Sequence, residues 1–318
     1  SLASGDPDEC ARAVHHHRRH GTTRQFASLV SALEAETLRS CAGLAGLVRR
    51  GEIAGIHLEG PFLSPAFAGA HDERVLREPD PARLERAQDA AEGGLRMVTV
   101  APELPGATEL IHWCHDHGVI AAIGHTDATA EETSRAVEAG ATVATHLCNA
   151  MRPLHHRDPG PVPVLLSDPS VTCELILDGA HLARPMVDLA AAAAGPDRLM
   201  AVSDAIGARG DRAATRLGTL DVELRDGVPT VAGTPTLAGS LITLADSFRQ
   251  VLDWGWSLAD ATRLHSTTPA RVAGLEVGFR VGGLADLVEL DPHTRRVRRV
   301  LRDGRWLTPA GPVTPSRG

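Results

Sequence analysis

The sequence contains no lysine and no tyrosine, and arginine supplies all 32 of its basic side chains. We attribute this bias to a coding sequence rich in alanine and arginine rather than to function. Acidic residues outnumber basic ones, so the formal net charge is −8 and the pI is about 6.0. Because binding to a phosphate backbone needs a basic face, this balance excludes nucleic acid as the main partner.

Cysteine is also scarce, and membrane signals are missing. The five cysteines are odd in number and none belongs to a Cys-x-x-Cys pair. This usage argues against a disulfide framework and suits a reducing compartment. The sequence shows neither an uncharged apolar run of membrane-spanning length nor a charged leader before an apolar run. We therefore expect a soluble, cytoplasmic protein with no membrane partner.

The most informative feature present is a set of five short segments in which an apolar run ends in a polar side chain. Buried parallel strands end in this way, and a parallel barrel gathers such strand ends on one face. A carboxylate with two imidazoles makes a metal site that keeps an open position, and a further aspartate can carry a proton. The side chains delivered by these segments are those of Glu59, His125, His146, His181 and Asp204.

Strand-like and helix-like runs alternate along most of the chain. This alternation predicts right-handed βαβ units and a parallel sheet, that is, a TIM-like (β/α) barrel. Seven strands are counted where a closed barrel of this type has eight. The predicted strands are 22–28, 53–59, 95–101, 119–125, 142–147, 172–177 and 199–203. The predicted helices are 7–20, 32–50, 81–92, 107–117, 130–139 and 185–194, with Asp127 or Thr129 as the cap before residue 130.

The pattern changes after Asp204. Residues 220–231 alternate around Asp226-Gly227, which predicts a hairpin. Helices are expected at 241–254 and 258–273. Short strand runs at 287–290 and 296–301 predict a small β structure, so we divide the chain into a barrel, 1–275, and part of a small β-sandwich domain, 276–318.

Eight short motifs resemble those of the N-acetylglucosamine-6-phosphate deacetylase family of the amidohydrolase superfamily. The resemblance runs from about residue 5 to residue 307, with the motifs in the family's order. The motifs are His-Leu-Glu-Gly-Pro-Phe (57–62), Gly-Ala-His-Asp (69–72), Gly-His-Thr (124–126), Thr-His-Leu-Cys-Asn-Ala-Met (145–151), Asp-Gly-Ala-His (178–181), Ser-Asp (203–204), Leu-Ala-Gly-Ser (237–240) and Gly-Leu-Ala-Asp-Leu-Val (283–288).

The chain departs from the family at its start. Family members begin with a β segment and a first barrel strand that carries a metal-facing pair, often His-x-His, and this sequence begins downstream of that pair. We expect the missing eighth strand to be the first one, whether the chain is a fragment or its start is misplaced. The barrel would then expose two strand edges, and its metal site would hold one ion rather than two.

The resemblance implies a role for each residue of the reaction centre. Glu59, His125 and His146 become ligands of one divalent ion, Zn²⁺ or Fe²⁺, both of which suit this donor set. Asp204 takes a proton from the attacking water and returns it to the leaving amine. His71 helps to polarise the substrate carbonyl.

The resemblance also implies a binding set for an amino-sugar phosphate. The backbone N–H groups of Asn149 and Ala150 could meet a phosphate, and Arg157 matches the family's phosphate-binding arginine. His181 matches a histidine that binds the sugar phosphate, and Leu237 belongs to the loop that lies against the sugar. A homodimer with its sites near the interface is expected.

The implied reaction is hydrolysis of the N-acetyl group of N-acetylglucosamine 6-phosphate to glucosamine 6-phosphate and acetate. Two other functions stay open: a different amidohydrolase, such as a deaminase or cyclic amidase, and a silent, truncated sugar-phosphate-binding protein. His57 shares a strand face with Glu59, and we expect it to pack in a barrel layer. Several site residues also have structural alternatives: a buried salt bridge for Glu59, core packing for His125 and His146, a helix cap for Asp204, a surface loop for His71 and pairing with Asp158 for Arg157.

Overall fold

The centre of the computed structural model is a seven-stranded parallel sheet, and the structure describes residues 2–207, 215–278 and 280–307. The strands pair in sequence order, each with the next. Their order and direction confirm the predicted βαβ units. The strands are β1 (Phe26–Val30), β2 (Gly55–Glu59), β3 (Leu95–Val100), β4 (Ile120–Ile123), β5 (Val143–Ala144), β6 (Thr172–Ile176) and β7 (Leu199–Val202).

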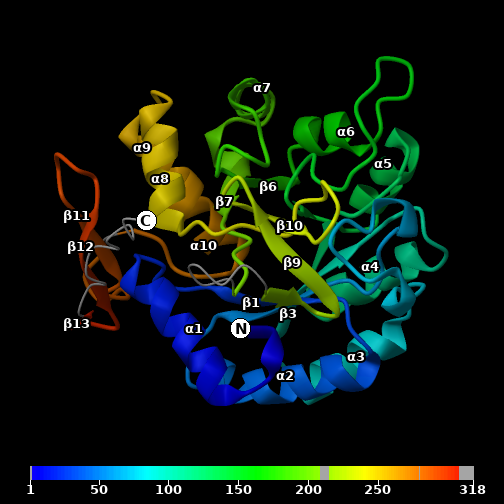
Figure 1. Ribbon diagram of the computed structural model, residues 1–318, viewed down its shortest axis with the longest axis horizontal. Coiled ribbons are helices and arrows are strands. Elements are labelled where there is room, and N and C mark those ends of the chain that lie inside the picture. Colours follow the sequence, from blue (N-terminus) through cyan, green and yellow to red (C-terminus); the bar gives the residue numbers. More distant parts are fainter. Residues whose placement is uncertain (1, 208–214, 279, 308–318) are drawn as a thin grey trace.

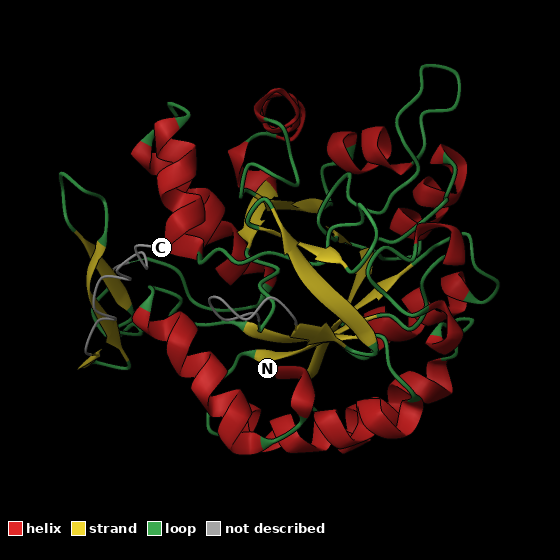
Figure 2. Ribbon diagram, in the orientation of Figure 1, coloured by secondary structure: helices red, strands yellow, loops and turns green. Residues whose placement is uncertain are grey.

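Helices surround the outside of this sheet, as Figures 1 and 2 show. Apolar side chains from both layers form one continuous core. Thr129, one of the two predicted caps, caps α5: its hydroxyl accepts the N–H of Glu132, and the Glu132 carboxylate accepts the N–H of Thr129. The helices are α1 (Pro7–Arg19), α2 (Glu34–Arg49), α3 (Pro81–Ala90), α4 (Ala107–Asp116), α5 (Ala130–Glu138), α6 (Pro161–Ser167) and α7 (Arg184–Ala194).

Two helical segments differ from the prediction. The short α6 was not predicted; Pro161 occupies its first helical turn, where proline is tolerated. The predicted helix 258–273 is divided into α9 (Leu258–Thr262), a π-helical turn (Arg263–Thr267) and α10 (Thr268–Val272). Pro269 lacks the N–H that would continue the regular ladder across this division.

A three-stranded antiparallel sheet, which contains the predicted hairpin, follows the seventh strand and lies across the main sheet in the view of Figure 1. It consists of β8 (Thr215–Leu217), β9 (Leu220–Arg225) and β10 (Val228–Val231), paired antiparallel. Asp226 and Gly227 form its turn with φ values of 53° and 81°, which confirms the predicted hairpin. The chain then enters α8 (Leu244–Asp253).

The last described strands form a separate three-stranded antiparallel sheet beside α1, at the left of Figure 1. They are β11 (Leu287–Leu290), β12 (Val297–Arg302) and β13 (Arg305–Leu307). Arg24 Nε lies 2.7 Å from Asp286 Oδ2, which ties the segment before β1 to this sheet. The division of the chain at residues 275 and 276 stays a prediction.

The main sheet is open in the described part of the chain, with β1 and β7 as its edges. The count of seven strands is therefore confirmed. Among the described helices, none combines the length and the hydropathy needed to cross a bilayer.

Candidate active site

Three predicted ligands meet at the carboxyl ends of the parallel strands. Glu59 is the last residue of β2, while His125 and His146 follow β4 and β5 by two residues each. Glu59 Oε1 lies 3.0 Å from His125 Nε2 and 2.8 Å from His146 Nε2, and the two nitrogens are 3.1 Å apart. Two ligands about 2.1 Å from a tetrahedral ion would be about 3.4 Å apart, so this buried trio fits one metal ion.

The backbone turns sharply at both histidines. His125 has a φ of 49° and His146 a φ of 26°, in the left-handed region that residues other than glycine seldom occupy. Such conformations are held by their surroundings and gather at functional sites. Here the turns end each strand and direct the imidazole toward Glu59 instead of along the sheet.

The hydrogen bonds of the rings show which nitrogen faces the site. His125 Nδ1 donates to the carbonyl of Phe67 at 2.9 Å, which leaves Nε2 free to bind a metal. Burial lowers the pKa of His125 to about 4, so this ring is neutral, as a ligand must be. Nδ1 of His146 is buried and has no hydrogen-bond partner among the residues that the structure describes.

Glu59 and His146 each shift the pKa of the other. Burial opposes charge on His146, yet the hydrogen bond and attraction of Glu59 raise its pKa to about 9. Burial likewise opposes charge on Glu59, but its hydrogen bonds with the histidines hold its pKa well below the usual range. Because metal ligands must be deprotonated, an ion at this position would displace the proton of His146.

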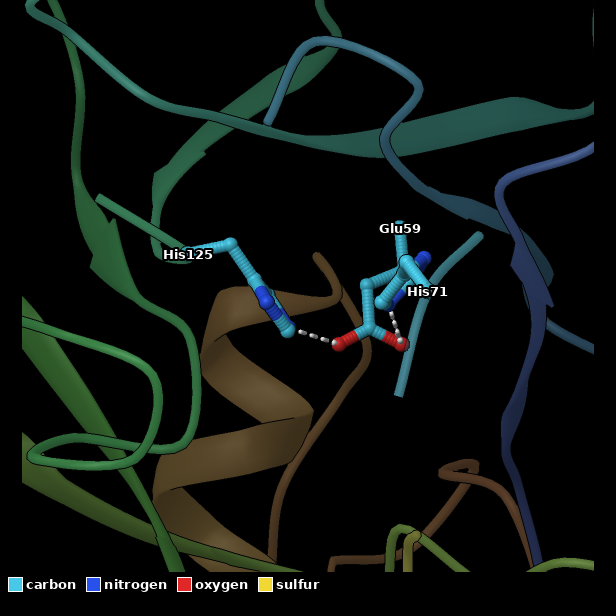
Figure 3. Close-up of side chains that lie close together, drawn as sticks. All are labelled: Glu59, His71 and His125. Carbon is cyan, nitrogen blue, oxygen red and sulfur yellow. Dashed lines mark hydrogen bonds and ion pairs between the residues drawn. The ribbon is translucent and has the colours of Figure 1, made fainter. Parts of the chain in front are cut away.

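His71 lies at one oxygen of the Glu59 carboxylate and His125 at the other (Figure 3). Its Nε2 is 3.8 Å from Glu59 Oε2, and the three ligand atoms of Glu59, His71 and His125 lie within 4.8 Å of one another. However, Nδ1 of His71 accepts the backbone N–H of Ser31 at 3.2 Å, so Nε2 of the neutral ring carries the hydrogen. That hydrogen suits a donor to a substrate carbonyl better than a metal ligand, so His146 is the better candidate for the third ligand. The surface-loop alternative for His71 is wrong, because the side chain is buried.

Asp204 follows β7 and is fixed by a later segment of the chain. Its carbonyl accepts the N–H of Ser240 at 2.8 Å, and its φ is 46°. Burial raises the pKa of Asp204, assisted by the charge of Glu59, while His146, His181 and His71 act in the opposite direction. A carboxyl group held among these charges at the wall of a cleft suits proton transfer.

The comparisons with known proteins agree with this geometry. A model of the amidohydrolase family matches residues 11–307. The chain belongs to the amidohydrolase family. Within it, the chain is 35% identical over 276 residues to N-acetylglucosamine-6-phosphate deacetylase of Bacillus subtilis, covering 85% of this chain and 68% of the relative.

Two further comparisons point to the same branch of the amidohydrolases. The human N-acetylglucosamine-6-phosphate deacetylase is 39% identical over 251 residues, covering 75% of this chain and 61% of the relative. A substituted form of the Mycobacterium smegmatis enzyme, solved in complex with N-acetyl-D-glucosamine-6-phosphate, is 46% identical with a TM-score of 0.93, covering 96% of this chain and 82% of that one. The predicted resemblance to N-acetylglucosamine-6-phosphate deacetylases is thus confirmed.

One continuous cleft brings the predicted residues together, as expected for an amidohydrolase active site. All of them line this cleft except Arg157. The Asn149 side chain donates to the carbonyls of His146 and Leu147, at 3.1 and 3.2 Å, and so holds the turn that carries the ligand. Leu237 forms a bridge with Thr230 of β10 and joins the hairpin to the segment that fixes Asp204.

Arg157 lies outside the cleft of its own chain. It is exposed, and its Nη1 is 2.8 Å from the ring of His156. The predicted alternative partner, Asp158, pairs instead with Arg152 at 3.0 Å. Within this chain the structure does not bring Arg157 to the other binding residues.

Glu174 is a residue of the site that the sequence argument missed. It stands within β6 and lines the cleft, and its Oε2 accepts the backbone N–H of His146 at 3.2 Å. Burial raises its pKa to about 7. The glutamate inside the apolar run 172–176 was a signal in the sequence, but the prediction considered only the polar residue that ends each run.

Proposed function

We propose that this amidohydrolase cleft hydrolyses the N-acetyl group of N-acetylglucosamine 6-phosphate to glucosamine 6-phosphate and acetate. The observation that carries the proposal is the convergence of Glu59, His125 and His146 beside Asp204 and His71, in a chain 46% identical to a deacetylase solved with that sugar phosphate. The reaction assigned to a whole relative is proposed here for a chain that spans 61–68% of two curated relatives.

Glu59, His125 and His146 would hold one divalent ion, Zn²⁺ or Fe²⁺. The chemistry that such an ion supplies is Lewis-acid activation of water and of the amide carbonyl. Their neutral nitrogens and single carboxylate leave an open position, which is the arrangement of catalytic rather than structural sites.

The remaining polar groups divide the proton work. Asp204 takes the proton of the attacking water, and the same proton then goes to the amine as the C–N bond breaks. His71 donates its Nε2 hydrogen to the amide oxygen, where negative charge develops. The amine leaves with the proton from Asp204, and the new carboxylic acid then loses its own proton to the amine. Acetate and the ammonium form of the sugar are the products, so water is the only other reactant.

Recognition of the phosphate requires groups beyond the reaction centre. The turn of Asn149 and Ala150 and the ring of His181 lie in the cleft and can approach the sugar phosphate. In a homodimer with its sites near the interface, Arg157 would reach the phosphate in the cleft of the other copy. The protein would work in the cytoplasm, where its phosphorylated substrate is retained.

The test is release of acetate by purified, metal-loaded protein. N-acetylglucosamine 6-phosphate should be hydrolysed, while free N-acetylglucosamine and a cyclic amide should react far more slowly. Charge-assisted bonds to phosphate are worth about 1.5–3 kcal/mol each, so Arg157→Ala should lower kcat/KM by about 10–100-fold on the phosphorylated sugar alone. Faster hydrolysis of a cyclic amide would refute the proposed substrate, and equal losses on both sugars would remove Arg157 from the phosphate site.

A further inference from the structure

The turn after β6 holds a histidine and an aspartate in direct contact. Asp178 Oδ1 accepts the backbone N–H groups of Ala180 and His181, both at 2.9 Å. Asp178 Oδ2 lies 2.7 Å from His181 Nδ1. Gly179, with a φ of 81°, allows the chain to turn back so that one carboxylate makes all three contacts.

The contact is protected from solvent. The side chains of His181 and Asp178 are 4% and 8% exposed. Although burial opposes charge on Asp178, its hydrogen bonds with His181 and Ala180 lower its pKa, so the carboxylate is ionised. An ionised carboxylate only accepts, and Nδ1 of His181 therefore carries a hydrogen.

The other ring nitrogen of His181 is the one left for a ligand. His181 lines the same cleft as Asp204. Within the described residues, the ring's one hydrogen bond to protein is the bond from Nδ1 to Asp178. With hydrogen on Nδ1, Nε2 of the neutral ring offers a lone pair rather than a hydrogen.

We propose that Asp178 is a positioning residue that fixes the tautomer of His181, so that Nε2 accepts a hydrogen bond from a hydroxyl group of the bound sugar. The proposal rests on the proposed function for the identity of that sugar. Asp178 touches no substrate itself. It acts by orienting the ring and by deciding that the ring accepts rather than donates.

The decisive variant is Asp178→Asn, whose amide can donate to Nδ1 and so reverse the tautomer. Nitrogen-15 NMR of the ring should show hydrogen on Nδ1 in the wild type and on Nε2 in the variant. KM for N-acetylglucosamine 6-phosphate should rise about tenfold, the worth of one hydrogen bond, with metal content unchanged. Asp178→Ser retains an oxygen for the turn but cannot reach the ring, so it should raise KM by a similar factor. It provides the test if the asparagine variant fails to fold.

Asp168 provides a matched control. Its Oδ1 accepts the N–H of Ser170 at 2.9 Å in a similar turn, but it faces no histidine. Asp168→Asn should leave both the tautomer and KM as in the wild type. In a His181→Ala background, Asp178→Asn should have no further effect on KM, because the ring through which it acts is gone.

The readouts separate this inference from the proposed function. The tautomer needs no substrate, so a wild-type ring with hydrogen on Nε2 would overturn the inference whatever the enzyme hydrolyses. Acetate release by the wild type with an unchanged KM in Asp178→Asn and Asp178→Ser would also overturn it. Absence of acetate release in a protein whose ring carries hydrogen on Nδ1 would refute the proposed function and leave the positioning role supported.

Discussion

Two buried histidines, His57 in β2 and His125 after β4, differ in the partners of their ring nitrogens. Burial lowers the pKa of both His57 and His125 to about 4. The two nitrogens of His57 contact the hydroxyl groups of Ser28, at 3.0 Å, and Thr99, at 2.8 Å, so the ring has no capacity left for a ligand. His125 uses one nitrogen for a backbone carbonyl and turns the other toward Glu59.

The contrast shows that burial and pKa do not identify a metal ligand. The partners of each nitrogen are more informative, because hydroxyl groups adjust their hydrogens to satisfy a ring, whereas a carboxylate and a second imidazole beside one nitrogen form a donor set that suits a cation. The prediction that His57 packs in a barrel layer agrees with its position.

The largest expected difference between His125 and His57 is in the amount of divalent metal that the protein retains when each is replaced. His125→Ala is expected to reduce bound divalent metal from about one ion per chain to nearly none, because it removes one of three donors. His57→Ala is the matched control and should retain its metal. Elemental analysis after dialysis measures both. Full metal content in His125→Ala would remove His125 from the site.

The second effect concerns Asp204, the proposed proton carrier, which lies outside the proposed metal trio. Asp204→Asn should keep the metal and lower kcat by roughly 10²–10⁴-fold, the usual contribution of a positioned acid and base. Steady-state kinetics on samples of known metal content provide the measurement. Turnover at the wild-type rate would mean that another group carries the proton.

Glu174 should have an intermediate effect through the backbone of His146. Glu174→Ala removes the acceptor of the His146 N–H and is expected to weaken metal affinity about tenfold, as loss of an outer partner does. Glu174→Gln keeps an oxygen in the same place and should stay close to the wild type. Competition with a chelator measures the affinities, and equal affinity in the alanine variant would show that the turn needs no such support.

The smallest effect on chemistry is expected beneath the site. His57→Ala leaves Ser28 and Thr99 without their shared partner, so the free energy of unfolding should fall by about 1–3 kcal/mol while kcat/KM stays unchanged. Denaturant unfolding with Ser28→Ala as the milder control measures this. A loss of kcat/KM as large as that of Asp204→Asn would place His57 in the reaction centre after all.

Strand ends were the most predictable part of the molecule. The apolar runs located β2, β4, β5 and β7, and the polar residue at or just after the end of each run gave the three predicted ligands and Asp204. The boundaries were less predictable: β5 is only two residues long because the chain leaves the ladder at His146, whose left-handed backbone no sequence pattern signals.

Other parts of the site depended on contacts that sequence spacing does not encode. The link between Glu174 and His146 joins two neighbouring strands, β6 and β5, and the contact between Asp178 and His181 depends on the path of a turn. Arg157 matched the family's phosphate-binding arginine, but the loop that carries it places it outside the cleft of its own chain. Local pattern predicted which residues matter more reliably than where they lie.

The backbone hydrogen bonds that hold Asp204 limit which parts of the cleft wall can change independently of it. Ser240 donates its N–H to Asp204, and Ile206 donates its N–H to the carbonyl of Ser240, so these two short segments hold each other in parallel. A Cβ atom at Gly239 would come within 2.7 Å of the Asp204 carbonyl, which keeps this contact dependent on glycine. The strands β8 to β10 lie in the chain between these two segments, and residues of β8 line the cleft. Substitutions there that leave the two hydrogen bonds intact are expected to change the wall of the cleft without moving Asp204.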